Sequence, residues 1–378
     1  MEKRTSQKVY FFWGAATSAH QVEGGNRNDW SAWEDAHGLE KSGQACDHYN
    51  RFREDFDIAK SLGHNAHRFS IEWSRIEPRE GEFDEHEIQH YREVLSALRE
   101  RGIEPFVTLW HWTIPIWFRD KGGLASKKAP MHFARYVERI VAALGSPTSN
   151  GEVGLPLVRR WITLNETNVY TGNGYWKGIW PPGERSFVRY IVSNHRLSVA
   201  HCKAYEVIKK INPAAEVGVA HSMIYFTKFG AAIKRYIYNN LFLNSIRAHQ
   251  DFVGINYYFS DRDTPEKSDM DWPIDSDGFY EVLRRASSYK KPIYILENGI
   301  ADAKDEKRAK FIHDHVEAMQ KAMREGADVR GYFYWSLLDN FEWAHGFAPR
   351  FGLVHVDYKT MERTVRASAL EYKSLIVK

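Results

Sequence analysis

Short apolar runs alternate with amphipathic helical segments along most of the chain. This alternation is typical of repeated βα units around a parallel sheet, in which each strand is buried on both faces. Eight runs have the length and the composition of a buried strand. They span Val9–Trp13, Ala66–Ile71, Glu104–Leu109, Arg160–Leu164, Glu216–Ala220, Phe252–Asn256, Pro292–Leu296 and Gly331–Trp335.

Helical periodicity fills several of the intervals between these runs, and some of the helices stop at a glycine-containing turn, as expected for a helix end. Eight βα repeats close naturally into a (β/α)8 barrel, a TIM barrel of class α/β. We therefore predict one catalytic barrel domain over residues 1–378. The predicted helices include Arg51–Leu62, His86–Arg101, Ala129–Leu144, Phe187–Ile211 and Lys307–Glu325.

Two glutamates follow predicted strands, Glu166 after the fourth and Glu297 after the seventh. In a (β/α)8 barrel, catalytic groups come from the carboxyl ends of the strands, so both side chains should lie on one face. Glycoside hydrolysis generally needs one carboxyl group that protonates the leaving oxygen and a second that attacks or stabilises the anomeric carbon. A single strand-end glutamate is more often a surface or ion-paired residue, so the surrounding motifs decide between these interpretations.

The composition predicts a compact chain and argues against a nucleic-acid or membrane protein. Apolar residues make up 43% of the 378 positions, and 52 basic against 49 acidic residues give a net charge of only +3. That charge is too small and too evenly mixed to recruit nucleic acid or an anionic membrane. Aromatic residues reach 14%, which suits stacking against sugar rings but also suits a large core.

The two cysteines, Cys46 and Cys202, form no disulfide framework and no metal-binding spacing, which favours a reducing compartment. The apolar run Val9–Ala16 resembles a short signal-peptide core, but cleavage after it would remove the first strand. The triplet Asn165-Glu166-Thr167 fits the glycosylation pattern, yet a glycan there would fill the proposed site. We expect a cytoplasmic protein.

Several strand-end motifs together resemble glycoside hydrolase family 1, the family of β-glucosidases and related β-glycosidases. They cover nearly the whole chain, and they occur on all but the fifth strand. They are Phe12-Trp13-Gly14-Ala15-Ala16-Thr17-Ser18-Ala19-His20-Gln21-Val22-Glu23-Gly24, Arg68-Phe69-Ser70-Ile71-Glu72-Trp73-Ser74-Arg75-Ile76, His111-Trp112, Asn165-Glu166, Gly254-Ile255-Asn256-Tyr257-Tyr258, Glu297-Asn298-Gly299, Trp335-Ser336-Leu337-Leu338-Asp339-Asn340-Phe341-Glu342-Trp343 and Arg350-Phe351-Gly352-Leu353.

The resemblance implies that Glu166 is the acid/base and Glu297 the nucleophile, with Arg68 and Tyr258 holding the nucleophile. A retaining mechanism requires carboxyl groups about 5–5.5 Å apart and proceeds through a covalent glycosyl-enzyme. The acid must begin protonated, so its surroundings should raise its pKa, whereas the nucleophile must stay ionised beside a cation or hydrogen-bond donors.

The resemblance also implies a substrate-binding set, in which Trp335 forms the stacking floor beneath the sugar. A carboxylate at Glu342 can accept hydrogen bonds from two sugar hydroxyls, which in the family are those at positions four and six. Family members that act on 6-phosphorylated sugars usually replace that glutamate with a small polar residue, so the sequence argues against them. The whole set is Gln21, His111, Trp112, Asn165, Asn256, Tyr258, Trp335, Glu342 and Trp343.

The chain departs from the family pattern beside the acid/base and in its loops. Thr167 replaces a usual proline, which leaves the position of Glu166 less fixed, and Asn168 replaces a frequent tryptophan, which predicts modest affinity for aryl or alkyl aglycones. The chain is shorter than most relatives, chiefly between Ala220 and Phe252, which predicts a more open or more mobile rim. Segment Ser260–Gly278 is predicted to be an active-site loop, and Ser146–Leu155 an exposed excursion.

The sequence thus predicts a retaining, exo-acting β-glycosidase, foremost a β-glucosidase with possible β-galactosidase or β-fucosidase activity. Its partners would be small β-glucosides or oligosaccharides, with no nucleic acid, no membrane and no metal or organic cofactor. Two alternatives remain open: a transglycosylase that uses the same residues, and a sugar-binding barrel that has lost activity. Both carboxylates are present, which disfavours the second alternative.

Overall fold

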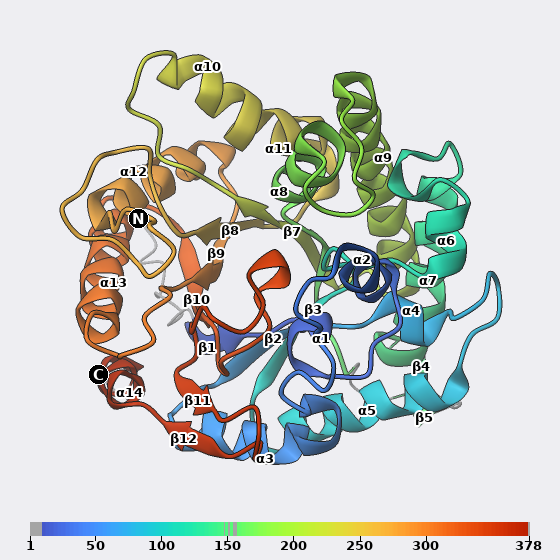
Figure 1. Ribbon diagram of the computed structural model, residues 1–378, viewed down its shortest axis with the longest axis horizontal. Coiled ribbons are helices and arrows are strands. Elements are labelled where there is room, and N and C mark those ends of the chain that lie inside the picture. Colours follow the sequence, from blue (N-terminus) through green and yellow to red (C-terminus); the bar gives the residue numbers. More distant parts are fainter. Residues whose placement is uncertain (1–9, 147, 150–151, 154–156, 377–378) are drawn as a thin grey trace, which may run out of the picture.

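The computed structural model describes residues 10–146, 148–149, 152–153 and 157–376. Eight parallel strands form a closed barrel in the order β1-β10-β9-β8-β7-β6-β3-β2, which confirms the predicted (β/α)8 fold. Helices surround the barrel (Figure 1). The barrel strands are β1 Phe12–Ala16, β2 Ala66–Ser70, β3 Glu104–Thr108, β6 Arg160–Asn165, β7 Glu216–Ser222, β8 Val253–Tyr257, β9 Ile293–Asn298 and β10 Val329–Trp335.

The helices and the small strands complete the fold. The helices are α1 Ala19–Val22, α2 Asp29–His37, α3 His48–Ser61, α4 Trp73–Ile76, α5 Glu85–Glu100, α6 Ile116–Asp120, α7 Ala129–Leu144, α8 Thr167–Thr171, α9 Phe187–Ile211, α10 Ala231–Arg235, α11 Leu241–Ser245, α12 Ser276–Ala286, α13 Arg308–Arg324 and α14 Ala367–Ile376. Short 3₁₀ or π turns are η1 Gly123–Ala125, η2 Gly172–Lys177, η3 Tyr236–Asn240, η4 Arg247–His249, η5 Ser287–Tyr289 and η6 Trp343–His345. The remaining strands pair as β4 Thr148–Ser149 with β5 Glu152–Val153, and β11 Val354–Val356 with β12 Arg363–Val365.

The first strand differs most from its predicted range. Val9 lies outside the described residues, and β1 continues past Trp13 to Ala16, where it pairs with Trp335. Gly14 lies inside the strand, where it permits a close approach, since a Cβ there would lie 2.0 Å from the Ala66 carbonyl oxygen. Residues Phe12–Ala16 of the signal-like run are therefore part of the barrel wall.

The later strands show smaller shifts. β9 extends to Asn298, so Glu297 is the last residue but one of the strand rather than a residue after it. β10 begins at Val329 instead of Gly331. Gly299 follows directly, and a Cβ there would lie 1.8 Å from the Trp335 carbonyl oxygen. The two strand ends that carry Glu297 and Trp335 are thereby brought into close contact.

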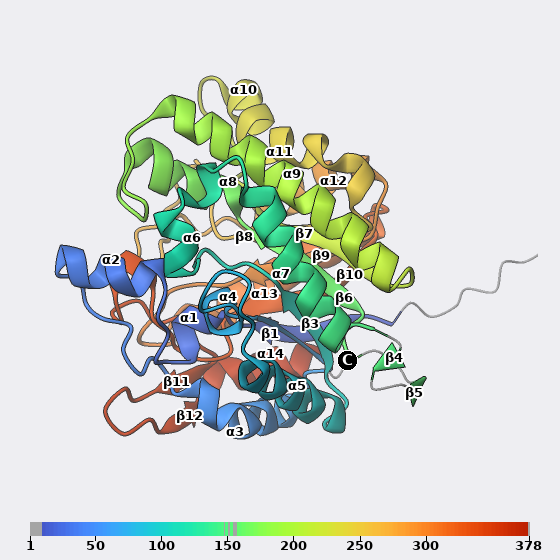
Figure 2. The same cartoon turned by 90° about the vertical axis from the view of Figure 1, so that its right-hand side faces the viewer.

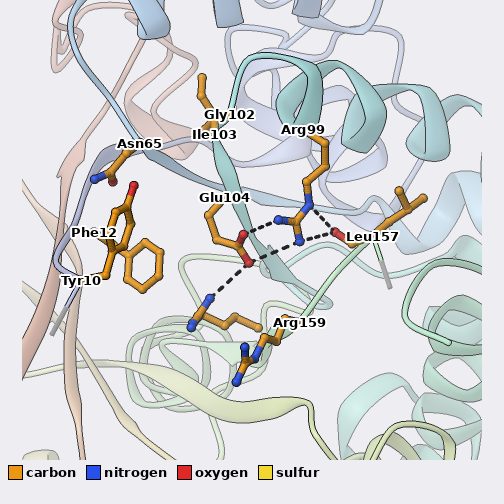
Figure 3. A pocket seen from close by; sticks show the side chains of 10 residues that line it. Tyr10, Phe12, Asn65, Arg99, Gly102, Ile103, Glu104, Leu157 and Arg159 are labelled. Carbon is orange, nitrogen blue, oxygen red and sulfur yellow. Dashed lines mark hydrogen bonds and ion pairs between the residues drawn. The ribbon is translucent and has the colours of Figure 1, made fainter. Parts of the chain in front are cut away.

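The two ends of the barrel differ in character. In Figure 2, β4 and β5 lie at one end and α2 lies at the other, where the strands have their carboxyl ends. A cavity at the β4–β5 end is lined by Arg99, Glu104 and Arg160, among others (Figure 3). Arg160 donates at 3.1 Å to both Glu104 and Glu216. These charges compensate one another at the end of the barrel that usually serves stability, so we assign this cavity a structural role.

Candidate active site

A cavity of about 680 Å³ opens at the carboxyl ends of the barrel strands. This volume lies within the range that is usual for small-molecule sites. The two strand-end glutamates, Glu166 and Glu297, are both part of its lining. Most of the predicted substrate-binding residues also line it, namely Gln21, His111, Trp112, Tyr258, Trp335, Glu342 and Trp343.

Three predicted residues lie behind this lining instead of on it. Asn165 and Asn256 are 1% and 0% exposed, and Arg68 is 1% exposed. Asn256 Nδ2 donates to Glu166 Oε1 at 2.9 Å and to Asn165 Oδ1 at 3.1 Å. Arg68 Nη2 donates to Asn165 Oδ1 at 2.7 Å. The three side chains therefore form a buried network that fixes the groups facing the cavity.

Glu166 sits at the N-cap of α8 in a left-handed conformation, with φ 44° and ψ 55°. Its backbone N–H donates to the Ala220 carbonyl at 2.8 Å, which ties it to the neighbouring strand β7. Burial raises the pKa of Glu166 well above 4.5, and the nearby Glu297 charge raises it further, while the Asn256 amide acts in the opposite direction. Such a group keeps its proton at a pH where an ordinary glutamate is ionised.

The negative charge of Glu297 is compensated by stronger hydrogen-bond donors than that of Glu166. Arg68 Nη1 donates to Glu297 Oε1 at 2.5 Å, and the Tyr258 hydroxyl donates to Oε2 at 2.6 Å. Burial raises the pKa of Glu297, but the Arg68 charge and both hydrogen bonds lower it, so its rise is smaller than that of Glu166. The pKa values of the two carboxyl groups are thus separated. Glu297 is the group that ionises more readily, and Glu166 is the group that keeps its proton.

Aromatic rings form much of the remaining wall. His111 lies parallel to Trp335 at 5.9 Å and to Trp343 at 6.2 Å, measured between ring centroids. Burial and the Arg68 charge lower the pKa of His111 well below 6.5, so the imidazole is neutral at pH 7. Trp112 Nε1 donates to the Asn165 carbonyl at 3.1 Å, which connects this wall to the buried network.

Gln21 and Glu342 form a polar part of the lining. Gln21 Nε2 donates to Glu342 Oε2 at 3.3 Å, and also to Asn340 Oδ1 at 2.9 Å. Burial and the charge of Glu297 raise the pKa of Glu342 to about 8, while the Gln21 hydrogen bond lowers it. An oxygen-rich wall of this kind can accept hydrogen bonds from sugar hydroxyls.

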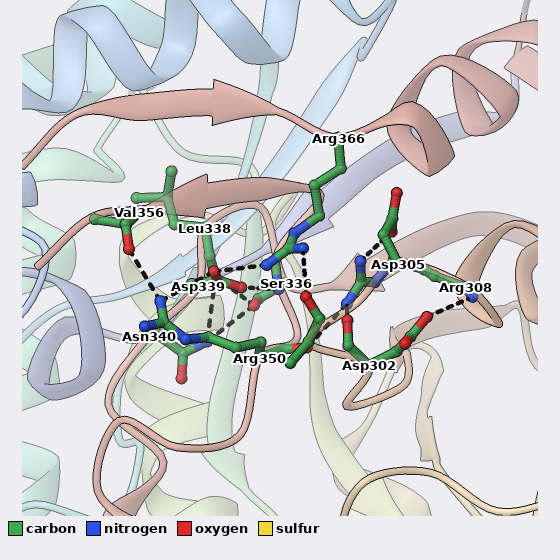
Figure 4. Close-up of polar contacts among 12 residues, drawn as sticks. Asp302, Asp305, Arg308, Ser336, Leu338, Asp339, Asn340, Arg350, Val356 and Arg366 are labelled. Atoms are coloured by element: carbon green, nitrogen blue, oxygen red, sulfur yellow. Dashed lines mark hydrogen bonds and ion pairs between the residues drawn. The ribbon is translucent and has the colours of Figure 1, made fainter.

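A buried ion network supports this polar wall (Figure 4). Asp339, which is fully buried, accepts from Arg350 at 3.2 Å and from Arg366 at 2.9 Å. The next residue, Asn340, donates to Ser336 Oγ at 2.8 Å and accepts from Gln21. The segment that contacts Gln21 is thus itself held by ion pairs with the two arginines.

Removing the carboxylate of this network should destabilise the fold strongly. We expect Asp339→Ala to lower the free energy of unfolding by about 3 kcal/mol, because two guanidinium groups lose their buried partner. Glu82→Ala is the matched control, since its pair with Arg79 is exposed at 65% and 80%, and should cost less than about 1 kcal/mol. Thermal melting of both variants checks this, and equal shifts would contradict it.

The raised pKa of Glu342 predicts that Glu342→Gln increases the stability of the fold by an amount that depends on pH. In the wild type the folded state holds this proton up to a pH of about 8, whereas the unfolded state releases it near 4.5. Stability should therefore fall as the pH rises between these values, and the amide removes that loss. Because Glu342 is partly exposed to the cavity, we expect the variant to gain about 1–2 kcal/mol more at pH 8.5 than at pH 4. Melting curves showing equal gains at both pH values would contradict this.

Some lining residues were missed by the sequence analysis. Met270 and Trp272 belong to the segment Ser260–Gly278, which was predicted to be an active-site loop, and both line the cavity. Four other aromatic residues of the lining come from the segments after β6 and β7, where no motif marked them; the only available signal was their aromatic character near the carboxyl end of the barrel. They are Trp176, Trp180, Tyr190 and Tyr238.

Asn168 has a structural role in addition to its place in the lining. Its Nδ2 donates to the Ser222 carbonyl at 2.9 Å and to the Tyr238 carbonyl at 3.3 Å. It therefore ties α8 to the end of β7 and to η3, in the region where the sequence predicts that the chain is shortened. Within the described residues, no group of three His, Cys, Asp or Glu side chains is placed to hold a metal ion, and no described helix combines the length and apolarity of a membrane span.

Comparison with known proteins identifies the relatives of this chain. The profile of Glycosyl hydrolase family 1 matches residues 4–237 and 260–378. Beta-glucosidase A of Thermotoga maritima is 33% identical over 441 aligned positions, covering 97% of this chain and 96% of the relative. A 6-phospho-beta-galactosidase of Staphylococcus epidermidis is 29% identical, with 97% of each chain covered. Since the 441 positions exceed the 378 residues here, the Thermotoga enzyme carries segments that this chain lacks.

Solved structures agree with this relationship. A beta-glycosidase from Pyrococcus horikoshii superposes with a TM-score of 0.90 at 36% identity, covering 97% of this chain and 93% of that one. The beta-glucosidase from Thermotoga maritima in complex with deoxynojirimycin gives a TM-score of 0.88 at 32% identity, with 97% of each chain covered. The fold is thus shared with these proteins over 97% of the chain.

Proposed function

Since this chain belongs to glycosyl hydrolase family 1, and is therefore an O-glycosyl hydrolase of the β-glycosidase type, we propose that it is a retaining, exo-acting β-glucosidase. The observation that carries this proposal is the pair of buried carboxyl groups in one cavity with unequal surroundings. Glu297 is held by a cation and a phenol, and Glu166 by a neutral amide. An ionised nucleophile beside a protonated acid is what the retaining mechanism requires.

In the first step, Glu297 attacks the anomeric carbon while Glu166 donates its proton to the departing glycosidic oxygen. The new glycosyl ester removes the negative charge from Glu297. The pKa of Glu166 then falls, because the Glu297 charge had helped to raise it. Ionised Glu166 can accept a proton from water, which attacks the anomeric carbon and releases the sugar with its original configuration.

The polar wall supports exo action on an unphosphorylated sugar. If Glu342 accepts hydrogen bonds from the hydroxyls at positions four and six, as the family resemblance implies, position four is free of a further sugar. Two side chains act on the pKa of Glu342: Glu297, which is acidic, and Gln21, which is neutral. A 6-phosphate placed against Glu342 would therefore lie beside acidic groups, which disfavours its binding.

The proposal is tested by hydrolysis rates on four aryl glycosides: the β-glucoside, β-galactoside, α-glucoside and 6-phospho-β-glucoside. We expect the β-glucoside to be cleaved fastest, the β-galactoside more slowly, and the other two at least about a hundredfold more slowly, since the missing contacts cost roughly 3 kcal/mol. Preferred cleavage of the phosphorylated glycoside would overturn the assignment.

Two alternatives use the same cavity. A transglycosylase would pass the sugar from Glu297 to another sugar rather than to water, and product analysis with a competing glucoside acceptor separates the two activities. A sugar-binding barrel would bind glucose and cleave none of the aryl glycosides. Glu297 is paired with Arg68 and Tyr258, and Glu166 with Asn256, which supports a catalytic barrel over a sugar-binding one.

A further inference from the structure

His20 is a buried histidine beside the cavity that takes no part in the proposed chemistry. It lies in the short helix α1, directly after β1, and is only 1% exposed. The next residue, Gln21, lines the cavity, whereas His20 does not. Both ring nitrogens of His20 nevertheless have polar partners, so the ring is held in one orientation.

The hydrogen bonds of His20 determine its tautomer. Asn28 Oδ1 accepts from the Ser31 backbone N–H at 2.9 Å, so the other end of the Asn28 amide is the nitrogen. Asn28 Nδ2 lies 3.0 Å from His20 Nδ1, which must therefore be the acceptor. The ring proton is then on His20 Nε2, which donates to Glu34 Oε1 at 2.9 Å. A flipped ring would lose both hydrogen bonds.

Glu34 is itself held by the segment that follows α2. Its side chain is 2% exposed, and Oε2 accepts from the backbone N–H and from the hydroxyl of Ser42, both at 2.9 Å. Asn28 caps the same helix and forms a capping box with Ser31. Both hydrogen-bond partners of His20 thus belong to one capped helix, which lies at the carboxyl end of the barrel (Figure 2).

The ring of His20 packs against Trp343, which lines the cavity. The two rings are nearly parallel, with an interplanar angle of 19° and centroids 5.4 Å apart. Trp343 has a φ of 54°, in the left-handed region that bulky residues rarely adopt. Such a backbone persists only where its surroundings impose it. Trp30 of α2 packs on the same indole at 4.7 Å, so α2 supports Trp343 both directly and through His20.

The segment after α2 also holds the loop that carries Glu342 and Trp343. Glu40 Oε2 accepts from the Phe347 backbone N–H at 3.0 Å. Gly346 has a φ of 61°, and a Cβ there would lie 1.9 Å from the same oxygen, so glycine permits this close approach. The Glu342 backbone N–H donates to the Gly346 carbonyl at 2.6 Å. The loop is thus fixed to the α2 region at two separate places.

We propose that His20 is a positioning residue, which sets the place of the Trp343 indole in the wall that receives the sugar. The inference rests on the proposed β-glycosidase function, because that function makes this wall a sugar-binding one. Glu34 and Asn28 orient the His20 ring, and the ring holds the indole. A small misplacement of a binding group far from the reacting bond can lower the rate strongly.

The test is a double-mutant cycle between His20 and Trp343. We expect His20→Ala alone to lower kcat/KM for an aryl β-glucoside about tenfold or more. In the Trp343→Ala background the same change should cost less than about twofold, because the indole through which His20 acts is already absent. A role in stability alone would give the same factor in both backgrounds. Equal factors would therefore overturn the inference.

Changes at Glu34 test the same role while the His20 ring stays in place. Glu34→Met removes both acceptor oxygens, and Glu34→Gln keeps one of them. We expect kcat/KM to fall about threefold or more in Glu34→Met, and less in Glu34→Gln. Thermal melting shows which variants fold, and the Glu34 series decides the question if His20→Ala does not. Wild-type rates in Glu34→Met, or the reverse order of the two losses, would overturn the inference.

His201→Ala is the matched control. His201 is 0% exposed, and its ring nitrogens lie 2.6 Å from Thr163 Oγ1 and 2.7 Å from the His249 carbonyl oxygen. It lies in α9, outside the cavity lining. We expect this variant to melt at a lower temperature but to keep kcat/KM within about twofold of the wild type. A loss as large as that of His20→Ala would overturn the inference.

Binding of deoxynojirimycin, the compound bound in the Thermotoga maritima structure, gives a measurement without turnover. By calorimetry, we expect His20→Ala to raise Kd about fivefold or more alone, and less than about twofold beside Trp343→Ala. Equal factors would overturn the inference and leave the proposed function standing. A wild type that binds the compound but cleaves no aryl β-glucoside would overturn the proposed function, and the binding cycle would still decide the role of His20.

Discussion

Replacing Glu297 with alanine should reduce kcat/KM for an aryl β-glucoside by about 10⁴- to 10⁶-fold, as expected when a nucleophile is removed. The loss should exceed any effect on sugar binding, because the lining contributed by Gln21, His111 and Glu342 remains. Added azide should restore part of the rate, since the shortened side chain leaves room for a small anion on the same face of the sugar. The product should be the α-glycosyl azide, formed with inversion.

The opposite stereochemistry provides the control for this experiment. In Glu166→Ala, Glu297 still forms the covalent intermediate, so azide attacks from the side of Glu166 and should give the β-glycosyl azide. Steady-state rates and product analysis by nuclear magnetic resonance measure both outcomes. The same azide anomer from both variants would contradict the assignment of the two roles. Thermal melting shows whether each variant is folded.

Replacing Glu166 with alanine should produce a loss that depends on the leaving group. We expect kcat/KM for an alkyl β-glucoside to fall by about 10²- to 10⁴-fold, because an alkoxide needs a proton in order to leave. The loss should be far smaller for a dinitrophenyl β-glucoside, whose phenolate leaves without protonation. Equal losses for the two substrates would show that Glu166 is not the acid.

The pH dependence of the same variant is a second signature. In the wild type, Glu166 holds its proton to a higher pH than usual, because burial and the Glu297 charge raise its pKa. The value of kcat/KM should therefore fall on the alkaline side as this proton is lost. With an alkyl β-glucoside as substrate for both proteins, this fall should disappear in Glu166→Ala, because the titrating group is absent. A pH–rate profile from pH 4 to pH 10 measures the change.

The barrel could be predicted from sequence because its strands are short, apolar and separated by helices with clear ends. Helices α7 and α9 match their predicted ranges: Pro130 lies in the first turn of α7, and the Ser186 side chain caps α9. The segment α10–η3–α11 was not predicted, because three of its apolar residues, Ile233, Ile237 and Leu241, face solvent. Periodicity assumes that apolar faces point inward.

The candidate site also contains residues that the sequence could predict and residues that it could not. Glu166, Glu297 and Trp335 could be found because they stand at strand ends, where the barrel fixes their direction. The second wall of the cavity could not be found in this way, because Tyr190 and Tyr238 come from a long helix and a π turn. Whether such side chains reach the cavity depends on how these segments pack, which local sequence does not determine.

The central claim is that Glu297 forms a covalent bond to the sugar. The most direct measurement is the intact mass and peptide map of the wild type after reaction with a 2-deoxy-2-fluoro-β-glucosyl fluoride, which slows release of the intermediate. We predict one added fluoroglucosyl group per chain, located on Glu297, with activity recovering as the label is lost. A label on another residue, or rapid turnover of aryl β-glucosides by a protein that is never labelled, would contradict this account.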